Sequence, residues 1–172
     1  MSFSADVKAT PHLEGALCKG LGALATIDRA RMTVGAATKL LGSVNVDAAL
    51  QVTQPNAARW DYVVGRKQGR KELLHWIEVH PASGTGNIVE MEAKLKWLAA
   101  WIGTTPLVSY PRQIVWIASE IGLQQPSPGA SYLGWPGLTI CWGPSGTLNH
   151  EERSPYRIDG PDQRPARASQ AL

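Results

Sequence analysis

The chain of 172 residues contains only two cysteines, Cys18 and Cys141, whose separation fits neither a metal-binding spacing nor a disulfide framework. No run approaches the roughly 18 consecutive apolar residues of a membrane-spanning helix. Residues 1–10 contain no apolar segment of the length found in signal peptides. We therefore expect reduced thiols, no membrane partner and a cytoplasmic location.

Several common catalytic and nucleotide-binding motifs are also missing. Ser109 and Ser119 lack the glycine context of a nucleophile elbow. The loop at residues 144–147 has no phosphate-binding lysine, and the glycine-containing segment 83–86 lacks the rest of a dinucleotide fingerprint. We find no internal repeat. Segment 83–86 is better explained as the cap of a following helix.

The composition indicates a folded protein with a mildly basic surface. The length suits one domain, the seven tryptophans favour a real core, and the net charge is +3. Such a charge permits an anionic partner without requiring one. From residue 143 the chain is rich in Pro, Arg, Asp and Ser. We therefore predict a single α/β domain over residues 11–142 and a mobile tail over residues 143–172.

The hydrophobic pattern predicts helices first. Apolar residues at steps of three and four indicate helical structure across residues 11–42, as one bent helix or two, although Gly15, Gly20 and Gly22 weaken this prediction. Alternation with period two predicts a strand over residues 44–52. A second strongly amphipathic helix is expected after residue 87, with an apolar stripe containing Met91, Leu95 and a side-chain pair between Glu90 and Lys94.

The remaining strands complete the predicted sheet. Residues 59–65 and 72–79 are expected to form a hairpin, with Pro81 ending its second strand. Residues 113–118 and 137–142 predict a fourth and a fifth strand. The expected fold is α/β, with a mixed sheet of four or five strands flanked by helices.

Two acidic residues stand out because they lie inside apolar strands, where an unpaired carboxylate is costly to bury. Side chains alternate along a strand, so Asp61 and Glu78 reach the same face if the hairpin has a suitable register. Two neighbouring carboxylates are the ligands that Mg²⁺ or Mn²⁺ prefers. His80 would share the face of Glu78 and could complete the metal shell or act as a base on water.

This order of elements resembles the PD-(D/E)xK nuclease superfamily, which has the restriction-endonuclease-like core αβββαβ. In that family an Asp lies on the second core strand and an acid-x-Lys tripeptide on the third. Asp61 and Glu78 match the two acids, whereas His80 occupies the position of the lysine. Some members carry the lysine on the following helix, where Lys94 or Lys96 could serve. Glu14 or Asp28 could match the acid that often assists from the first helix.

The resemblance implies a metal-dependent nuclease that cleaves DNA or RNA. Its catalytic residues would be Asp61, Glu78, His80 and Lys94, with Asp61 and Glu78 as ligands of Mg or Mn. A basic cluster would then contact phosphates without reading sequence: Arg66, Lys67, Arg70 and Lys71.

Other interpretations stay open. The domain could be a catalytically inactive nuclease-like module that binds nucleic acid or protein, and it could form a homo-oligomer. It could also be an unrelated α/β domain in which Glu78 and His80 bind a transition metal or only stabilise structure. Asp61 could pair with Arg59, the basic cluster could be a solvated turn, and Trp97 and Trp101 could simply pack on the sheet.

Overall fold

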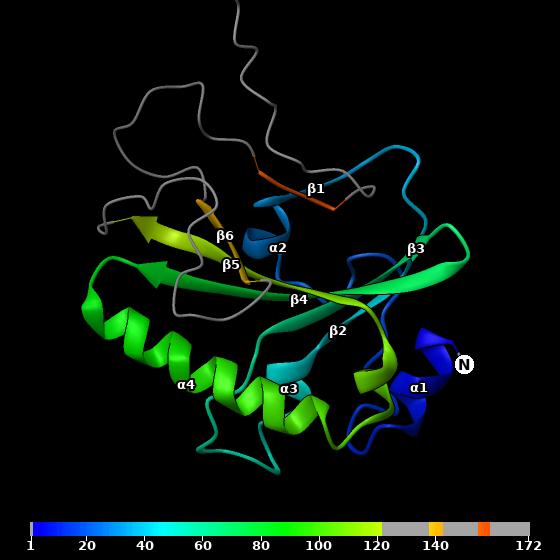
Figure 1. Cartoon of the computed structure of the whole chain (residues 1–172), viewed down its shortest axis with the longest axis horizontal. Coiled ribbons are helices and arrows are strands. Elements are labelled where there is room, and N and C mark those ends of the chain that lie inside the picture. The colour runs from blue at the N-terminus through cyan, green and yellow to red at the C-terminus, as the bar shows by residue number, and fades with distance from the viewer. Residues whose placement is uncertain (1, 122–137, 143–154, 159–172) are drawn as a thin grey trace, which may run out of the picture.

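A computed structural model describes residues 2–121, 138–142 and 155–158. Five strands form one mixed sheet in the order β2-β3-β4-β5-β6 (Figure 1). Strand β3 runs antiparallel to both of its neighbours, β2 and β4, whereas β4, β5 and β6 run parallel. The bounds are β2 Leu40–Asn45, β3 Tyr62–Gln68, β4 Lys71–Ala82, β5 Arg112–Ile121 and β6 Leu138–Trp142. The predicted α/β class and mixed sheet are therefore confirmed.

Helices and a second small sheet cover the two faces of this sheet (Figure 1). On one face lie α1 Phe3–Ala9, α3 Val46–Leu50, α4 Thr85–Ile102 and the 3₁₀ turn η1 Pro106–Ser109. On the other lie α2 Thr26–Arg29 and a parallel pair of strands, β1 Met32–Val34 and β7 Tyr156–Ile158. Each face has its own apolar cluster, so the central strands are buried on both sides.

The β3–β4 hairpin sets the register on which the candidate site depends. Gln68 pairs with Lys71 across a two-residue loop, and Gly69 has a φ of 61°, which glycine adopts without steric cost. The register continues to the pair Tyr62 and Ile77 at the other end of the hairpin. The predicted hairpin is confirmed, with its turn at residues 69–70.

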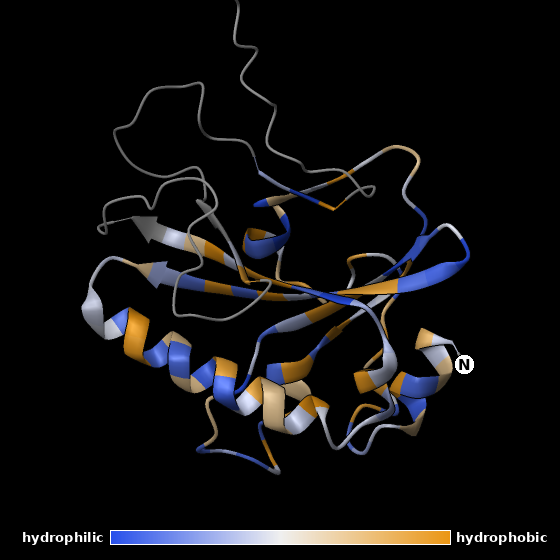
Figure 2. Cartoon of the chain, in the orientation of Figure 1, coloured by the Kyte–Doolittle hydropathy of each residue, from blue (hydrophilic) through white to orange (hydrophobic). Residues whose placement is uncertain are grey.

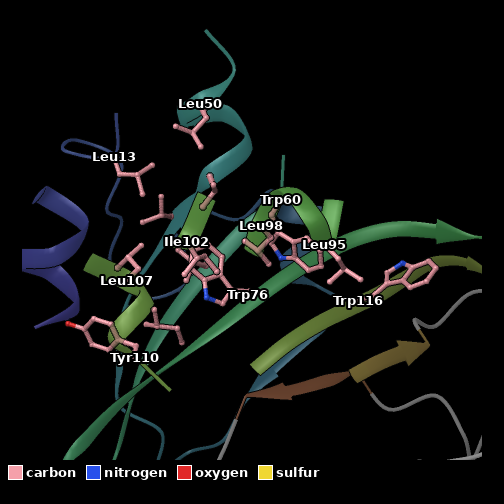
Figure 3. Packing of buried hydrophobic residues seen from close by; sticks show 14 of the residues in the cluster. Leu13, Leu50, Trp60, Trp76, Leu95, Leu98, Ile102, Leu107, Tyr110 and Trp116 are labelled. Carbon is pink, nitrogen blue, oxygen red and sulfur yellow. The ribbon is translucent and has the colours of Figure 1, made fainter. Parts of the chain in front are cut away.

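Helix α4 provides the crossover between the parallel strands β4 and β5. Its apolar stripe, visible in Figure 2, is buried at Met91, Leu95, Leu98 and Ile102. These side chains pack on Trp76 and neighbouring core residues of the sheet (Figure 3). The helix predicted from this stripe is confirmed.

The helical prediction for residues 11–42 is wrong. This segment is mostly turns, with only α2 and the strands β1 and β2 as regular elements. Gly20 has a φ of 59°, which no right-handed helix accommodates, while Leu13 and Leu24 are buried as separate anchors. A helix forms earlier instead, at α1, where Phe3 and Val7 are buried one turn apart.

Other strand boundaries also differ from the prediction, and the strand expected at residues 59–65 is β3, Tyr62–Gln68. The expected strand at 44–52 ends at Asn45, whose side-chain oxygen accepts from the Ala48 amide at 2.8 Å and caps α3. Val46 and Leu50, four residues apart, are then buried on one face of that short helix. Pro81 does not end β4. The strand continues to Ala82 through a register shift against β5.

Three residues of the expected mobile tail form the strand β7, in which Tyr156 and Ile158 are buried. The other residues of the expected tail, 143–154 and 159–172, lie outside the described residues. Among the helices of the described segments, none is long and apolar enough to cross a membrane.

Candidate active site

Asp61 and Glu78 converge at the open end of the β3–β4 hairpin. Because Tyr62 pairs with Ile77, Asp61 and Glu78 are the next residues across the two strands, and both side chains turn toward α4. The Asp61 amide donates to Glu78 Oε2 at 3.1 Å, and the Val79 amide donates to Asp61 Oδ2 at 2.9 Å. This reciprocal pairing places the two carboxylates side by side, as the sequence predicts.

Lys94 reaches the two acids from α4. Its Nζ lies 2.5 Å from Glu78 Oε1 and 3.8 Å from Asp61 Oδ1, and it donates to the Arg59 carbonyl at 2.9 Å. Of the two lysines considered from the sequence, Lys94 is therefore the one at the acids, while Lys96 is exposed. The ammonium supplies a positive charge where two carboxylates would otherwise repel one another.

Burial dominates the electrostatics of this cluster. The Glu78 side chain is 1% exposed, and loss of hydration raises its pKa to about 8, with the Asp61 charge acting in the same direction and Lys94 opposing. Loss of hydration also raises the pKa of Asp61, against the Lys94 charge and the Val79 amide. Glu78 Oε1 forms the close ion pair with Lys94 but, within the described structure, no hydrogen bond of suitable angle. That oxygen keeps acceptor capacity.

His80 lies beside this cluster and is contacted on its solvent side by Glu90. Its Nδ1 is 4.0 Å from Glu78 Oε1, and its Nε2 is 2.6 Å from Glu90 Oε2. Its backbone carbonyl accepts from Trp116 Nε1 at 2.9 Å. The expected pairing of Glu90 with Lys94 along α4 is not formed. Glu90 contacts His80 of β4 and Lys94 contacts Glu78 of β4 instead. All four predicted catalytic residues thus lie in one place.

The loop before Asp61 is fixed by Arg59, whose role the sequence did not indicate. Arg59 Nε lies 2.8 Å from Asp47 Oδ1, and Nη1 donates to the carbonyl of Gln54. Trp97 Nε1 donates to Gln54 Oε1 at 3.0 Å from α4. Arg59 therefore pairs with Asp47 and not with Asp61, and Asp61 is not neutralised by this guanidinium.

The basic cluster does not form one surface. Arg66 is 2% exposed and donates from Nε to His75 Nε2 at 2.9 Å, so the prediction that it contacts phosphate is wrong. Lys67 is half-exposed and paired with Glu72 at 2.8 Å. Arg70 and Lys71 are exposed at the hydrophilic tip (Figure 2). From Asp61 to Gln68 a strand extends roughly 23 Å, so this tip is distant from the acids.

Neither first-helix acid joins the site. Glu14 is exposed in a turn. Asp28, in α2, accepts from the Tyr62 hydroxyl at 2.7 Å on the other face of the sheet, and its charge contributes only weakly to the raised pKa of Asp61.

The described residues contain no group of three or more His, Cys, Asp or Glu side chains arranged to hold a metal ion. Comparison of the chain with protein-family models, with curated proteins and with solved structures found no match.

Proposed function

We propose that the protein is a metal-dependent phosphodiesterase acting on nucleic acid, with a restriction-endonuclease-like core. The observation that carries this proposal is the meeting of Asp61, just before β3, with Glu78 of β4 and Lys94 of α4 in a partly buried polar cluster. An ion pair with Lys94 requires only one carboxylate. The second carboxylate, in a site where loss of hydration raises the pKa of both acids, is held ionised at a cost in stability. Such strain is typical of catalytic sites.

The arrangement agrees with the resemblance found in the sequence. The short helix α1 precedes β2, β3 and β4 in place of the longer helix expected within residues 11–42, α3 lies between β2 and β3, and α4 and then β5 follow. Asp61 directly precedes the second of these three strands, and Glu78 lies on the third. Lys94 occupies the place of the lysine that some family members carry on the following helix. These similarities support the assignment of a restriction-endonuclease-like core, although no family model matches the chain.

A divalent ion fits the chemistry of the two acids. Mg²⁺ usually keeps several waters and binds through one or two carboxylates together with substrate phosphate. Asp61 and Glu78 would hold it, since Glu78 Oε1 retains acceptor capacity and the Asp61 side chain is 23% exposed. When bound, Mg²⁺ or Mn²⁺ would supply positive charge to the scissile phosphate. Lys94 would have to yield part of its contact with Glu78.

The other residues have roles that follow from their charge. His80 Nδ1 would accept a proton from water, and the resulting hydroxide oxygen would form a new P–O bond while the bond to the leaving oxygen breaks. The leaving oxygen would take a proton from solvent. The Lys94 ammonium would stabilise the negative charge that grows on the phosphate oxygens in this step.

One observation favours the inactive binding module as a second candidate. Lys94 already neutralises Glu78 at 2.5 Å, which is the contact expected if catalysis had been lost and the acids retained for structure. In that case nucleic acid would be bound through exposed charges such as Arg70 and Lys71, without cleavage.

Cleavage assays decide between the two. Plasmid, single-stranded DNA and RNA are incubated with the protein in Mn²⁺ or Mg²⁺ and in chelator. The nuclease requires metal-dependent cleavage that falls by about 1,000-fold in Asp61→Asn and Glu78→Gln but persists in Glu92→Gln, a control on α4. Salt-sensitive binding with no cleavage would instead establish the binding module.

A further inference from the structure

Glu90 is the one carboxylate of the site that the proposed chemistry leaves unused. Its side chain is 60% exposed, yet it contacts the His80 imidazole at 2.6 Å, across ten residues of sequence. This hydrogen bond to His80 is the main reason that the pKa of Glu90 lies below its usual range. An exposed glutamate has many conformations available, so a contact this short defines the orientation of the ring.

The two nitrogens of His80 face different carboxylates. Nε2 faces Glu90 Oε2 on the solvent side, and Nδ1 faces Glu78 Oε1 at 4.0 Å on the buried side. A carboxylate only accepts hydrogen bonds, so Glu90 favours the neutral tautomer that carries its proton on Nε2. Nδ1 then presents a lone pair to the buried acids. Without Glu90, Glu78 would be the acceptor that remains, and it would favour a proton on Nδ1.

We infer that Glu90 is a positioning residue that keeps the Nδ1 lone pair of His80 directed at the Asp61–Glu78 cluster. This inference rests on the proposed function for its catalytic consequence, since only a base at that place needs the lone pair. The contact itself is independent of the reaction. The cation of the cluster, Lys94, forms an ion pair with Glu78 and donates to the Arg59 carbonyl.

The anchoring of His80 supports this role. The backbone of His80 is fixed by the hydrogen bond from Trp116 Nε1 at 2.9 Å, so the side chain can differ mainly by rotation about its own bonds. Glu90 lies in the second turn of α4, one helical turn before Lys94, and therefore follows the same element that places the lysine. One helix would thus set both the positive charge and the orientation of the base.

The tautomer can be measured without any activity. Nitrogen-15 NMR of the full chain at about pH 9 separates protonated from unprotonated ring nitrogens of histidine. In the unaltered protein we expect the His80 proton on Nε2. In Glu90→Ala the proton should move substantially to Nδ1, while Glu92→Ala, two residues along α4 and on a different side of the helix, should leave it in place. An unchanged tautomer in Glu90→Ala would overturn the inference.

The catalytic consequence needs the cleavage assay. Because loss of an orienting partner typically reduces activity by 10- to 100-fold, Glu90→Ala should lower metal-dependent cleavage by about that factor, and Glu92→Ala should not. Glu90→Gln, which keeps an acceptor oxygen, should recover part of the rate. A moved tautomer with an unchanged rate would refute the role of Glu90 in catalysis. If the unaltered protein cleaves nothing, the proposed function fails, whereas the tautomer still decides whether Glu90 positions the ring.

Discussion

Strand β4 carries two buried polar residues three positions apart, His75 and Glu78, which face opposite sides of the sheet. His75 accepts from Arg66 Nε at 2.9 Å and lies 2.7 Å from the Tyr156 hydroxyl. Because a guanidinium always donates, the neutral ring must carry its proton on Nδ1 and donate to Tyr156. Each polar atom of the ring is thus satisfied. Glu78, by contrast, lies beside a second acid and keeps an oxygen without a hydrogen bond.

The difference teaches which buried polar group stabilises the fold and which is under strain. Burial lowers the pKa of His75 to about 3, so the ring stays neutral as its hydrogen bonds require. Burial raises the pKa of Glu78 to about 8, so the ionised carboxylate is held at a cost in stability. A satisfied network fits a structural role, whereas an energetically costly one needs a functional reason.

The largest expected effect is the loss of cleavage when Lys94, the cation of the Asp61–Glu78–Lys94 cluster, is replaced. Lys94→Met removes the ammonium that would stabilise charge on the phosphate, so cleavage should fall by about 100-fold or more. Lys96→Met, an exposed lysine on the same helix, is the matched control and should retain full activity. Initial rates at saturating Mn²⁺ measure the difference. Equal rates for the two variants would remove Lys94 from the mechanism.

A substitution in the hydrogen-bonded cluster of Arg66, His75 and Tyr156 should instead lower the stability of the fold. His75→Ala leaves the buried Arg66 guanidinium without its acceptor and opens a cavity, so the free energy of unfolding should fall by about 2–4 kcal/mol. Urea unfolding followed by tryptophan fluorescence measures this loss. The cleavage rate per folded molecule should not change. A rate that falls with the folded fraction held constant would contradict the division between the two clusters.

The two clusters should also have opposite pH dependence. Glu78 has a folded pKa above its unfolded value, so its contribution to stability is fully present below about pH 4.5 and is lost as the pH rises through about 8. In chelator, Glu78→Gln should therefore stabilise the protein by on the order of 1–3 kcal/mol near pH 8 and by little near pH 4. Thermal unfolding of both proteins across this range tests the sign.

His75 provides the counterpart within the same titration. Its folded pKa of about 3 is below the unfolded value, so its contribution is present above about pH 6.5 and is lost as the pH falls toward 3. The destabilisation caused by His75→Ala should accordingly shrink in acid. If both variants showed the same pH trend, the two clusters would not differ in the way their surroundings indicate.

The smallest effect is expected at the far end of the hairpin. Arg70→Gln with Lys71→Gln should leave stability within about 0.5 kcal/mol, because both side chains are exposed. If the tip contacts phosphate, the slope of log affinity against log salt should decrease by about 2. Fluorescence anisotropy with a labelled duplex measures the slope. An unchanged slope would leave the tip as a solvated turn.

Part of the fold could be predicted because its causes are local. The apolar stripe containing Met91 and Leu95 specifies α4 whatever surrounds it, and alternation with a glycine turn specifies the hairpin. The segment 11–42 could not be predicted, because leucines that anchor turns in a core occupy the same positions as leucines on a helix. Only contacts with residues distant in sequence distinguish leucines that anchor turns from leucines on a helix.

The candidate site divides in the same way. The two acids were identified because a charge inside an apolar pattern is visible in sequence, whereas Lys94 came from the family resemblance, which left Lys96 as an alternative. The burial of Arg66 was not identified, because its partner His75 lies on another strand and Tyr156, which contacts the other ring nitrogen of His75, comes from far along the chain. Glu90 was assigned to the wrong partner for a similar reason: helical spacing favours Lys94, but β4 offers His80 at 2.6 Å.

The sequence by itself determined that Asp61 and Glu78 lie within neighbouring apolar segments joined by a glycine-containing hairpin, because both features are local. The tertiary structure supplied the register that brings the two acids to one face. Only the tertiary structure decided which cation meets them, which lysine reaches inward and which arginine is buried. Those outcomes depend on how α4 and β7 pack on the sheet. Packing between segments distant in sequence produces no periodic pattern of residues from which it could be predicted.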